Sequence, residues 1–204
     1  MAVAPQRRRT QEERRAETRG KLLDATLTSL LEVGYAQTTT RRVAEMAGVT
    51  TGAQTHHFPY RVDLVVAAVE RIVEQRIEEL TRRTAALPDG REERTRAILE
   101  LLWNDFSSDL FTVIVKVWIA AADDAELYER LVPLERRLTR TIAAAIPDIV
   151  GDREMPPDLG ARVTLTLAAL RGLALSRAYE PTARRAKDPW PVVRPILERL
   201  LHHA

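Results

Sequence analysis

The sequence of 204 residues contains no cysteine, and aromatic residues make up only 5% of it. The absence of cysteine excludes disulfide frameworks and thiolate metal sites. No apolar run approaches the ~20 residues that a helix needs to span a bilayer. The basic N-terminus is not followed by an apolar core, so we expect neither a membrane segment nor a secretory signal.

Sequence patterns that accompany catalysis are also missing. There is no glycine-rich phosphate loop, no G-x-S-x-G sequence and no metal-ligand cluster. His56 and His57 are adjacent, and neighbouring helical residues point ~100° apart, so they chelate a metal ion poorly. The sequence therefore predicts no enzyme, no catalytic residue, no bound metal and no cofactor.

The charged residues are unevenly distributed along the chain. The formal net charge is +2, from 31 basic and 29 acidic residues. Residues 1–60 carry nine basic and six acidic residues, whereas the remainder carries 22 and 23. Because a basic excess favours contact with phosphates, the N-terminal end is the expected position of a nucleic-acid contact.

Residues 38–58, TTTRRVAEMAGVTTGAQTHHF, predict two short helices joined by a tight turn. Val43, Ala44 and Ala47 form an apolar stripe on the first helix. Gly48 follows, where a helix end favours a residue that tolerates positive φ. The candidate N-caps are Thr38 or Thr39 for the first helix and Thr50 for the second. Helix, glycine turn and helix is the helix-turn-helix pattern of DNA-binding proteins.

With its flanks, this stretch resembles the DNA-binding end of the TetR family of transcriptional regulators. The resemblance covers roughly residues 20–65. Its matching positions are a threonine pair, Val43-Ala44, Ala47-Gly48-Val49-Thr50, Gly52, His57-Phe58, Arg61 and Leu64. The resemblance implies an all-α, TetR-like fold, in which a three-helix DNA-binding domain precedes a helical ligand-binding and dimerisation domain.

The resemblance also implies which residues contact double-stranded DNA. It places base contacts at Thr51, Ala53 and Thr55, and it places phosphate contacts at Thr39, His57 and Arg61. The full set of predicted DNA-binding residues is Thr39, Thr50, Thr51, Gly52, Ala53, Gln54, Thr55, His57 and Arg61.

Some of these positions need comment, and two of them, Thr50 and Gln54, have more than one interpretation. Gly52 inside a helix costs ~1 kcal/mol relative to alanine, which close backbone approach to DNA would explain. Thr50 either only caps the helix or also contacts DNA. Gln54 and Thr55 stand where the family usually has a bulky apolar residue and a tyrosine. Gln54 therefore either points outward, where it could bond to adenine, or lies half-buried against the first helix.

The remaining sequence divides into a tail and a long helical region. Residues 1–19 are polar and predict a flexible tail, or a basic arm that contacts DNA through Arg7, Arg8 and Arg9. We assign residues 20–65 to the DNA-binding domain, with Tyr35 packed beneath the helix-turn-helix, and residues 66–204 to the second domain. The helical patterns outside the two short helices cover residues 20–33, 61–86, 91–106, 109–121, 124–145, 158–179 and 190–203. A loop is expected at residues 147–157.

Large aromatic side chains are concentrated in the C-terminal half. They form either a solid core or the wall of an apolar effector pocket between helices. The candidate pocket residues are Trp103, Phe106, Phe111 and Trp118.

The last two helices are candidates for contact between subunits. Residues 158–179 are apolar nearly all round, so this helix needs a second packing partner. The predicted dimer interface is formed by Leu167, Leu170, Leu173, Val193, Ile196, Leu197 and Leu200. A symmetric pair could read a palindromic site.

The combined hypothesis is a cytoplasmic bacterial regulator, associated with the nucleoid when it is bound to DNA. It would be a homodimeric repressor of a palindromic operator, released by a largely apolar small molecule. The alternative is a helical interaction protein whose helix-turn-helix lacks specific DNA readout.

Overall fold

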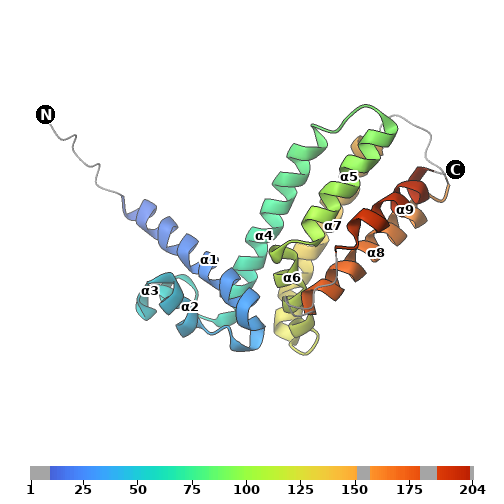
Figure 1. Ribbon diagram of the computed structural model, residues 1–204. Coiled ribbons are helices and arrows are strands. Elements are labelled where there is room, and N and C mark those ends of the chain that lie inside the picture. Colours follow the sequence, from blue (N-terminus) through green and yellow to red (C-terminus); the bar gives the residue numbers. More distant parts are fainter. Residues whose placement is uncertain (1–9, 151–156, 180–187, 203–204) are drawn as a thin grey trace, which may run out of the picture.

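The computed structural model describes residues 10–150, 157–179 and 188–202, and these residues form helices joined by turns and short connections (Figure 1). The helices are α1 (Gln11–Gln37), α2 (Thr40–Ala47), α3 (Thr51–His57), α4 (Arg61–Thr84), α5 (Arg91–Phe106), α6 (Asp109–Ala121), α7 (Ala125–Val150), α8 (Leu159–Tyr179) and α9 (Trp190–His202). The predicted all-α fold class is confirmed. The bounds of α5 and α6 are those predicted from the sequence.

The helix α1 begins nine residues earlier than predicted. Thr10 forms a capping box, in which its side chain accepts from the Glu13 amide at 3.1 Å and its own amide donates to Glu13 Oε2 at 2.8 Å. The Thr-x-x-Glu spacing is a helix-start pattern that the charge-based interpretation overlooked. The predicted flexible tail is therefore wrong for residues 11–19, whereas Arg7, Arg8 and Arg9 lie outside the described residues.

A small core holds α1, α2, α3 and the start of α4 together at one end of the molecule (Figure 1). The apolar stripe of α2 supplies Val43, which is fully buried in this core. Its buried members are Leu22, Leu23, Ala25, Val43, Phe58, Leu64, Ala67 and Ala68. The two short helices have little apolar surface of their own, so α1 and α4 supply most of the burial that stabilises them.

A second core joins α1 and α4 to α6 and α7. Its buried members include Leu30, Tyr35, Val65, Ile72, Val113, Val117, Leu127 and Leu131. Tyr35 belongs to this core, so the prediction that it packs beneath the helix-turn-helix is wrong. The predicted domain boundary at residues 65 and 66 falls inside α4, which contributes to both cores.

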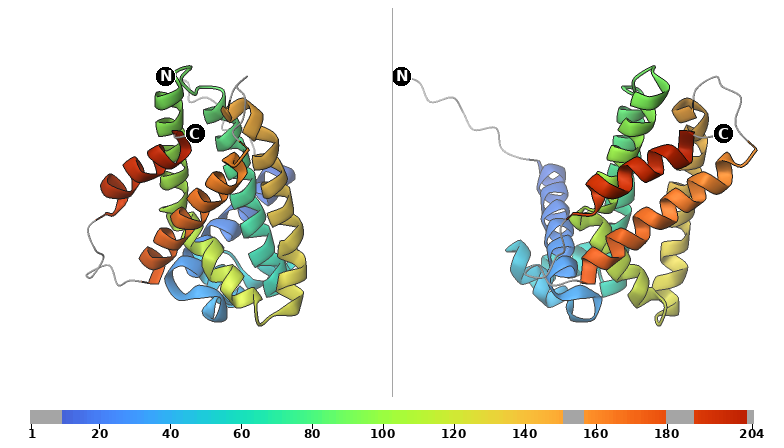
Figure 2. Two further views of the ribbon diagram at one scale, coloured as in Figure 1. Left: turned by 90° about the vertical axis from the view of Figure 1, so that its right-hand side faces the viewer. Right: turned by 45° about the vertical axis from the view of Figure 1, so that its right-hand side comes forward.

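A third core joins α5 to α8 and α9, which lie together away from α3 (Figures 1 and 2). Trp103 of α5 and Trp190 of α9 stack with centroids 5.1 Å apart and planes 9° apart. The Trp190 indole donates to Glu100 Oε2 at 2.9 Å, and Arg194 pairs with Glu100 at 2.7 Å. The polar contacts of Glu100 therefore fix α9 on α5.

Two sequence expectations about the C-terminal half need correction. The helix α7 continues to Val150, so the loop expected from residue 147 begins at least four residues later. One helix of the described residues, α8, is also long and apolar enough by composition to cross a membrane, with a mean hydropathy of 1.2 over Leu159–Ser176. Core helices of soluble proteins share this property, so it does not by itself identify a membrane segment.

Candidate functional site

The α2–α3 unit is built by the caps that the sequence predicted. The Arg42 amide donates to Thr39 Oγ1 at 3.1 Å, and the Ala53 amide donates to Thr50 Oγ1 at 3.2 Å. Gly48 ends α2 with a φ of 65°, in the left-handed region that favours glycine. These local bonds set the turn between the two helices and fix the direction of α3.

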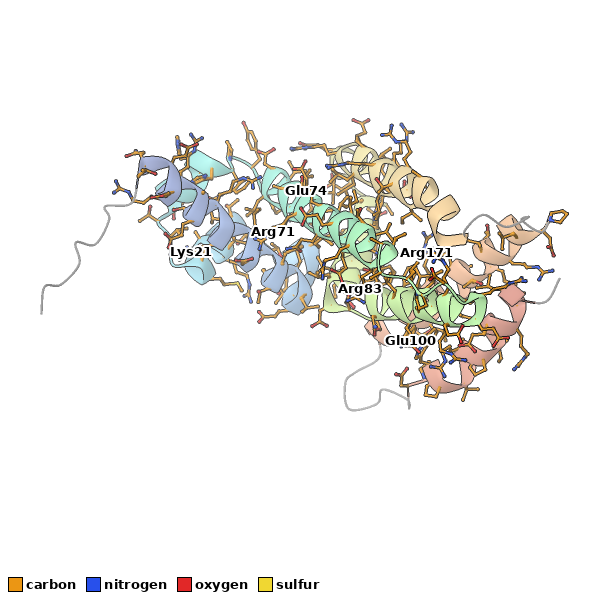
Figure 3. The ribbon with its side chains drawn as sticks, turned by 90° about the horizontal axis from the view of Figure 1, so that it is seen from above. Lys21, Arg71, Glu74, Arg83, Glu100 and Arg171 are labelled. Atoms are coloured by element: carbon orange, nitrogen blue, oxygen red, sulfur yellow. The ribbon has the colours of Figure 1, made fainter. Side chains whose placement is uncertain are left out.

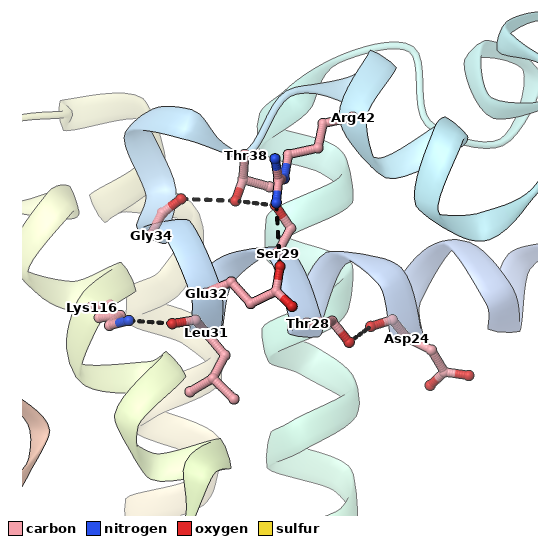
Figure 4. Close-up of polar contacts among 9 residues, drawn as sticks. All are labelled: Asp24, Thr28, Ser29, Leu31, Glu32, Gly34, Thr38, Arg42 and Lys116. Atoms are coloured by element: carbon pink, nitrogen blue, oxygen red, sulfur yellow. Dashed lines mark hydrogen bonds and ion pairs between the residues drawn. The ribbon is translucent and has the colours of Figure 1, made fainter. Parts of the chain in front are cut away.

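Side-chain bonds anchor this unit to α1 (Figure 4). The Ser29 and Thr38 hydroxyls lie 2.9 Å apart in a buried pair, and Thr38 also donates to the Gly34 carbonyl at 2.8 Å. Arg42 of α2 donates to Glu32 of α1 at 3.2 Å. Sequence reasoning missed these contacts because they join residues that no local pattern connects.

The outward face of α3 consists of small and polar residues. Thr51, Gly52 and Thr55 are exposed, and Ala53 and His57 are partly exposed. A Cβ built on Gly52 would have no atom within 4 Å other than those of its chain neighbours and its own helix backbone. Packing inside the chain therefore does not require glycine at this position, and a short-faced helix is open to a partner such as the edge of a base pair.

Gln54 does not belong to this face. Its side chain is 1% exposed, and its amide donates to the Phe58 carbonyl at 2.7 Å. The glutamine thus closes the end of α3 from inside the core, which is why it can replace a bulky apolar residue. Its predicted contact with DNA is wrong, and the alternative of a residue turned toward the first helix describes it better.

Arg61 is held between helices in the described structure. Its guanidinium lies 4.1 Å from the centroid of the Tyr35 ring and donates to the Tyr35 carbonyl at 3.5 Å. The Tyr35 hydroxyl donates to Asp124 Oδ2 at 3.0 Å. Burial and this bond raise the pKa of the Tyr35 phenol, whereas backbone and Tyr35 donors lower the pKa of the Asp124 carboxyl. Arg61 would have to leave this cluster to reach a phosphate.

Basic side chains of α1 lie beside the end of α3. Arg19 is 5.6 Å from the centroid of the Phe58 ring, and both Arg15 and Arg19 disfavour the charged form of His57. Burial is the larger cause of the lowered pKa of the His57 imidazole. Arg15 and Arg19 are exposed and were missed as candidate phosphate contacts, because nearby glutamates masked them in the sequence.

A large cavity lies among α4, α5, α6, α7 and α8, with a volume of about 1620 Å³. Of the four predicted pocket residues, Phe106, Phe111 and Trp118 line it. Trp103 does not, because it packs on Trp190 in the third core. Most of the lining is apolar, so the cavity suits a ligand with a sizeable apolar part.

The predicted dimer residues divide into two groups. Leu170 and Leu197 are 0% and 4% exposed inside the third core, so their assignment to a subunit interface is wrong. Ile196 is 51% exposed. The others pack partly against the same core, namely Leu167, Leu173, Val193 and Leu200. The predicted interface set does not include three exposed apolar residues of α8 and α9, namely Leu165, Leu175 and Val192.

Comparison with known proteins agrees with this geometry. Residues 22–68 match the family described as bacterial regulatory proteins, tetR family. A 38% identity over 123 residues, 60% of each chain, relates it to the HTH-type transcriptional regulator CymR of Pseudomonas putida. An uncharacterized HTH-type transcriptional regulator of Mycobacterium tuberculosis is 27% identical over 93% of this chain and 97% of its own.

Solved structures share the fold over nearly the whole chain. The multidrug binding protein EbrR, complexed with imidazole, superposes with a TM-score of 0.64 over 99% of both chains at 21% identity. The named relatives are regulators and not enzymes. Residues 22–68 are therefore a segment of the type that defines the tetR family of bacterial regulatory proteins, and the chain as a whole has the fold of EbrR.

Proposed function

We propose that the protein is a homodimeric repressor that binds a palindromic operator and releases it when a small molecule enters the cavity. It acts in the cytoplasm, and on the nucleoid while it is bound to DNA. Thr51, Gly52, Ala53 and Thr55 face the bases, and Thr39, Thr50 and His57 lie at the rim of the same surface. Residues 20–65 form the DNA-binding domain.

The course of α4 is the observation that carries this proposal. Its first half packs in the same core as α2 and α3 through Leu64, Ala67 and Ala68. Its second half supplies Val73 and Arg76 to the cavity lining. Along α4, Arg71 and Glu74 lie nearer α1, whereas Arg83 lies toward α5 (Figure 3). A ligand that shifts the second half of α4 therefore moves the DNA-reading unit as well.

The uncovered surface of α8 and α9 supports a dimer. Only 17% of the apolar Leu159–Ser176 window is buried within the chain. Val192 and Ile196 of α9 are 71% and 51% exposed. Large apolar side chains that stay exposed on two neighbouring helices favour a subunit interface at this position. Two subunits are also needed because one short helix reads too few base pairs for useful specificity.

The cavity supports release by a ligand. EbrR, which has the same fold, is described as a multidrug binding protein. A difference of ~10² in ligand affinity between the DNA-bound and released conformations, about 2.7 kcal/mol, is sufficient for a regulatory response.

A double variant of α3 tests the DNA-reading surface. Thr51→Ala with Thr55→Ala should lower affinity for DNA upstream of the protein's own gene by about tenfold or more, because each base contact contributes ~1–3 kcal/mol. The measurement is a titrated gel shift at two salt concentrations. Thr28→Ala with Thr81→Ala is the matched control, since both hydroxyls donate to carbonyls of their own helices.

Unchanged affinity and base preference in the α3 variant would remove this surface from the proposal. Binding with a steep salt dependence but no sequence preference would favour a helical protein without specific readout.

A further inference from the structure

The charges around the cavity are not balanced. Six arginines and three carboxylates line it, which leaves an excess of three positive charges within an otherwise largely apolar surface. The arginines are Arg76, Arg83, Arg91, Arg94, Arg136 and Arg171, and the acids are Glu79, Asp105 and Glu135.

The carboxylates of the cavity already have partners. Asp105 pairs with Arg76, and Glu79 pairs with Arg83. Glu135 accepts a hydrogen bond from the Thr139 hydroxyl at 3.1 Å. A cationic ligand would therefore meet a positive surface on which each acid is engaged. An anionic ligand would instead meet a lining with more positive than negative charges.

Arg171 is the charged residue that α8 contributes to the lining. It is exposed, and within the described parts of the chain it has no ion-pair or hydrogen-bond partner. The other α8 residues of the lining are Leu159, Val163, Thr166, Leu167 and Leu175. Arg171 and Arg83 lie in the half of the molecule remote from α1 (Figure 3). A cation on a helix whose other lining residues are mainly leucine and valine suits a ligand with one charged end and an apolar body.

A second, independent observation concerns Thr166. Its side chain is 2% exposed, lines the cavity, and has a hydroxyl with no hydrogen-bond partner. Thr164 and Ser176 of the same helix donate to the carbonyls of Gly160 and Gly172. Since a buried hydroxyl without a partner destabilises the protein, Thr166 points to an acceptor supplied from outside the chain.

We propose that the cavity takes an anionic amphiphile, an organic acid with an extended aliphatic or aromatic body. Its carboxylate pairs with Arg171 and accepts from Thr166, and its body lies against the apolar residues of α4 to α8. This inference rests on the proposed function only in treating the cavity as the effector site.

The test compares three ligands that share a ten-carbon chain and differ in the head group. Decanoate, decanol and decyltrimethylammonium are titrated into the full chain by calorimetry. Decanoate should bind at least tenfold more tightly than the other two. Arg171→Gln should weaken decanoate at least fivefold and change decanol by less than twofold, whereas Arg171→Lys should retain most of the preference. Arg140→Gln, which removes an exposed charge outside the cavity lining, should change nothing.

Thr166→Val gives a further readout that does not depend on Arg171. The variant should unfold at a higher temperature without ligand, because it removes the unpaired hydroxyl, and it should weaken decanoate more than decanol. Three results would overturn the proposal. They are equal or tighter binding of the ammonium compound, a carboxylate preference that survives in Arg171→Gln, and no binding of any of the three ligands.

The two proposals can fail separately. If decanol or the ammonium compound releases operator DNA and decanoate does not, the regulatory function stands and the assignment of an acid is wrong. If decanoate binds through Arg171 but leaves DNA affinity unchanged, the ligand class stands and the regulatory function is wrong.

Discussion

At the scale of single residues, the environment of His57 sets the proton balance at the proposed DNA surface. Burial and the nearby Arg15, His56 and Arg19 lower the pKa of this imidazole below its usual value of 6.5. In the free protein the neutral ring is therefore favoured. The folded state therefore gains stability as pH rises from the lowered folded-state pKa to the unfolded-state pKa. It loses this stability as pH falls through the same interval. A DNA phosphate beside the ring acts in the opposite direction, because it favours the charged form.

We expect operator binding to take up a proton at His57. Affinity should rise as pH falls from about 8 toward the lowered pKa, because protonation then accompanies phosphate contact. The measurement is fluorescence anisotropy of labelled operator DNA across this range at constant ionic strength. His57→Gln should flatten the profile, whereas His56→Gln, which removes a neighbour that also lowers the pKa of His57, should retain the pH dependence and shift it to higher pH. A profile that is the same in all three proteins would show that His57 does not contact phosphate.

At the scale of elements, α3 combines local determinants that the sequence reveals with a non-local one that it does not. The caps by Thr39 and Thr50 and the turn at Gly48 involve residues within a few positions of each other, so their types and spacing predicted both helices. The inward direction of Gln54 depends on the core made by α1 and α4, and its residue type gave no indication of it. Packing within the chain does not explain why position 52 is glycine.

Gly52→Ala separates helix stability from DNA contact. Alanine should stabilise α3 by about 0.5–1 kcal/mol, since it lowers the backbone entropy of the unfolded chain and its Cβ meets no atom. The same methyl group should weaken operator binding about tenfold if the backbone of α3 approaches the bases. Chemical denaturation and a gel shift measure the two effects. Gly20→Ala in α1, where a Cβ also has open space, should stabilise without changing affinity. A stabilised Gly52→Ala protein with unaltered affinity would contradict close approach.

The C-terminal elements show where sequence patterns reach their limit. Helical periodicity placed α5 and α6 correctly, because it reflects one buried face per helix. It could not decide which of two partners covers an apolar residue, so Leu170 and Leu197 were assigned to a subunit contact although they lie in the third core. Trp103 was assigned to a pocket for the same reason, since its partner Trp190 lies 87 positions away in the chain.

At the scale of the whole molecule, three cores are arranged in series and α4 connects the first two. The Tyr35, Arg61 and Asp124 cluster joins α1, α4 and the turn before α7 at the point where the DNA-reading unit meets the rest of the chain. Lys116 of α6 also donates to the Leu31 carbonyl of α1 (Figure 4). Because these contacts are made by side chains from distant segments, they are the route by which the proposed function expects movement of α6 or α7 around a ligand to reach α1 and α4.

The central claim is that two copies of α3 read one two-fold symmetric DNA site. Footprinting on DNA upstream of the protein's own gene, with the complex mass determined in the same buffer, tests this claim most directly. The account predicts two protected half-sites one or more helical turns apart, about 34 Å for one turn, bound by an even number of subunits. Val192→Glu with Ile196→Glu, which charges the exposed face of α9, should abolish both the dimer and the paired protection. A single protected segment bound by one subunit, or paired protection that survives in the charged variant, would contradict the account.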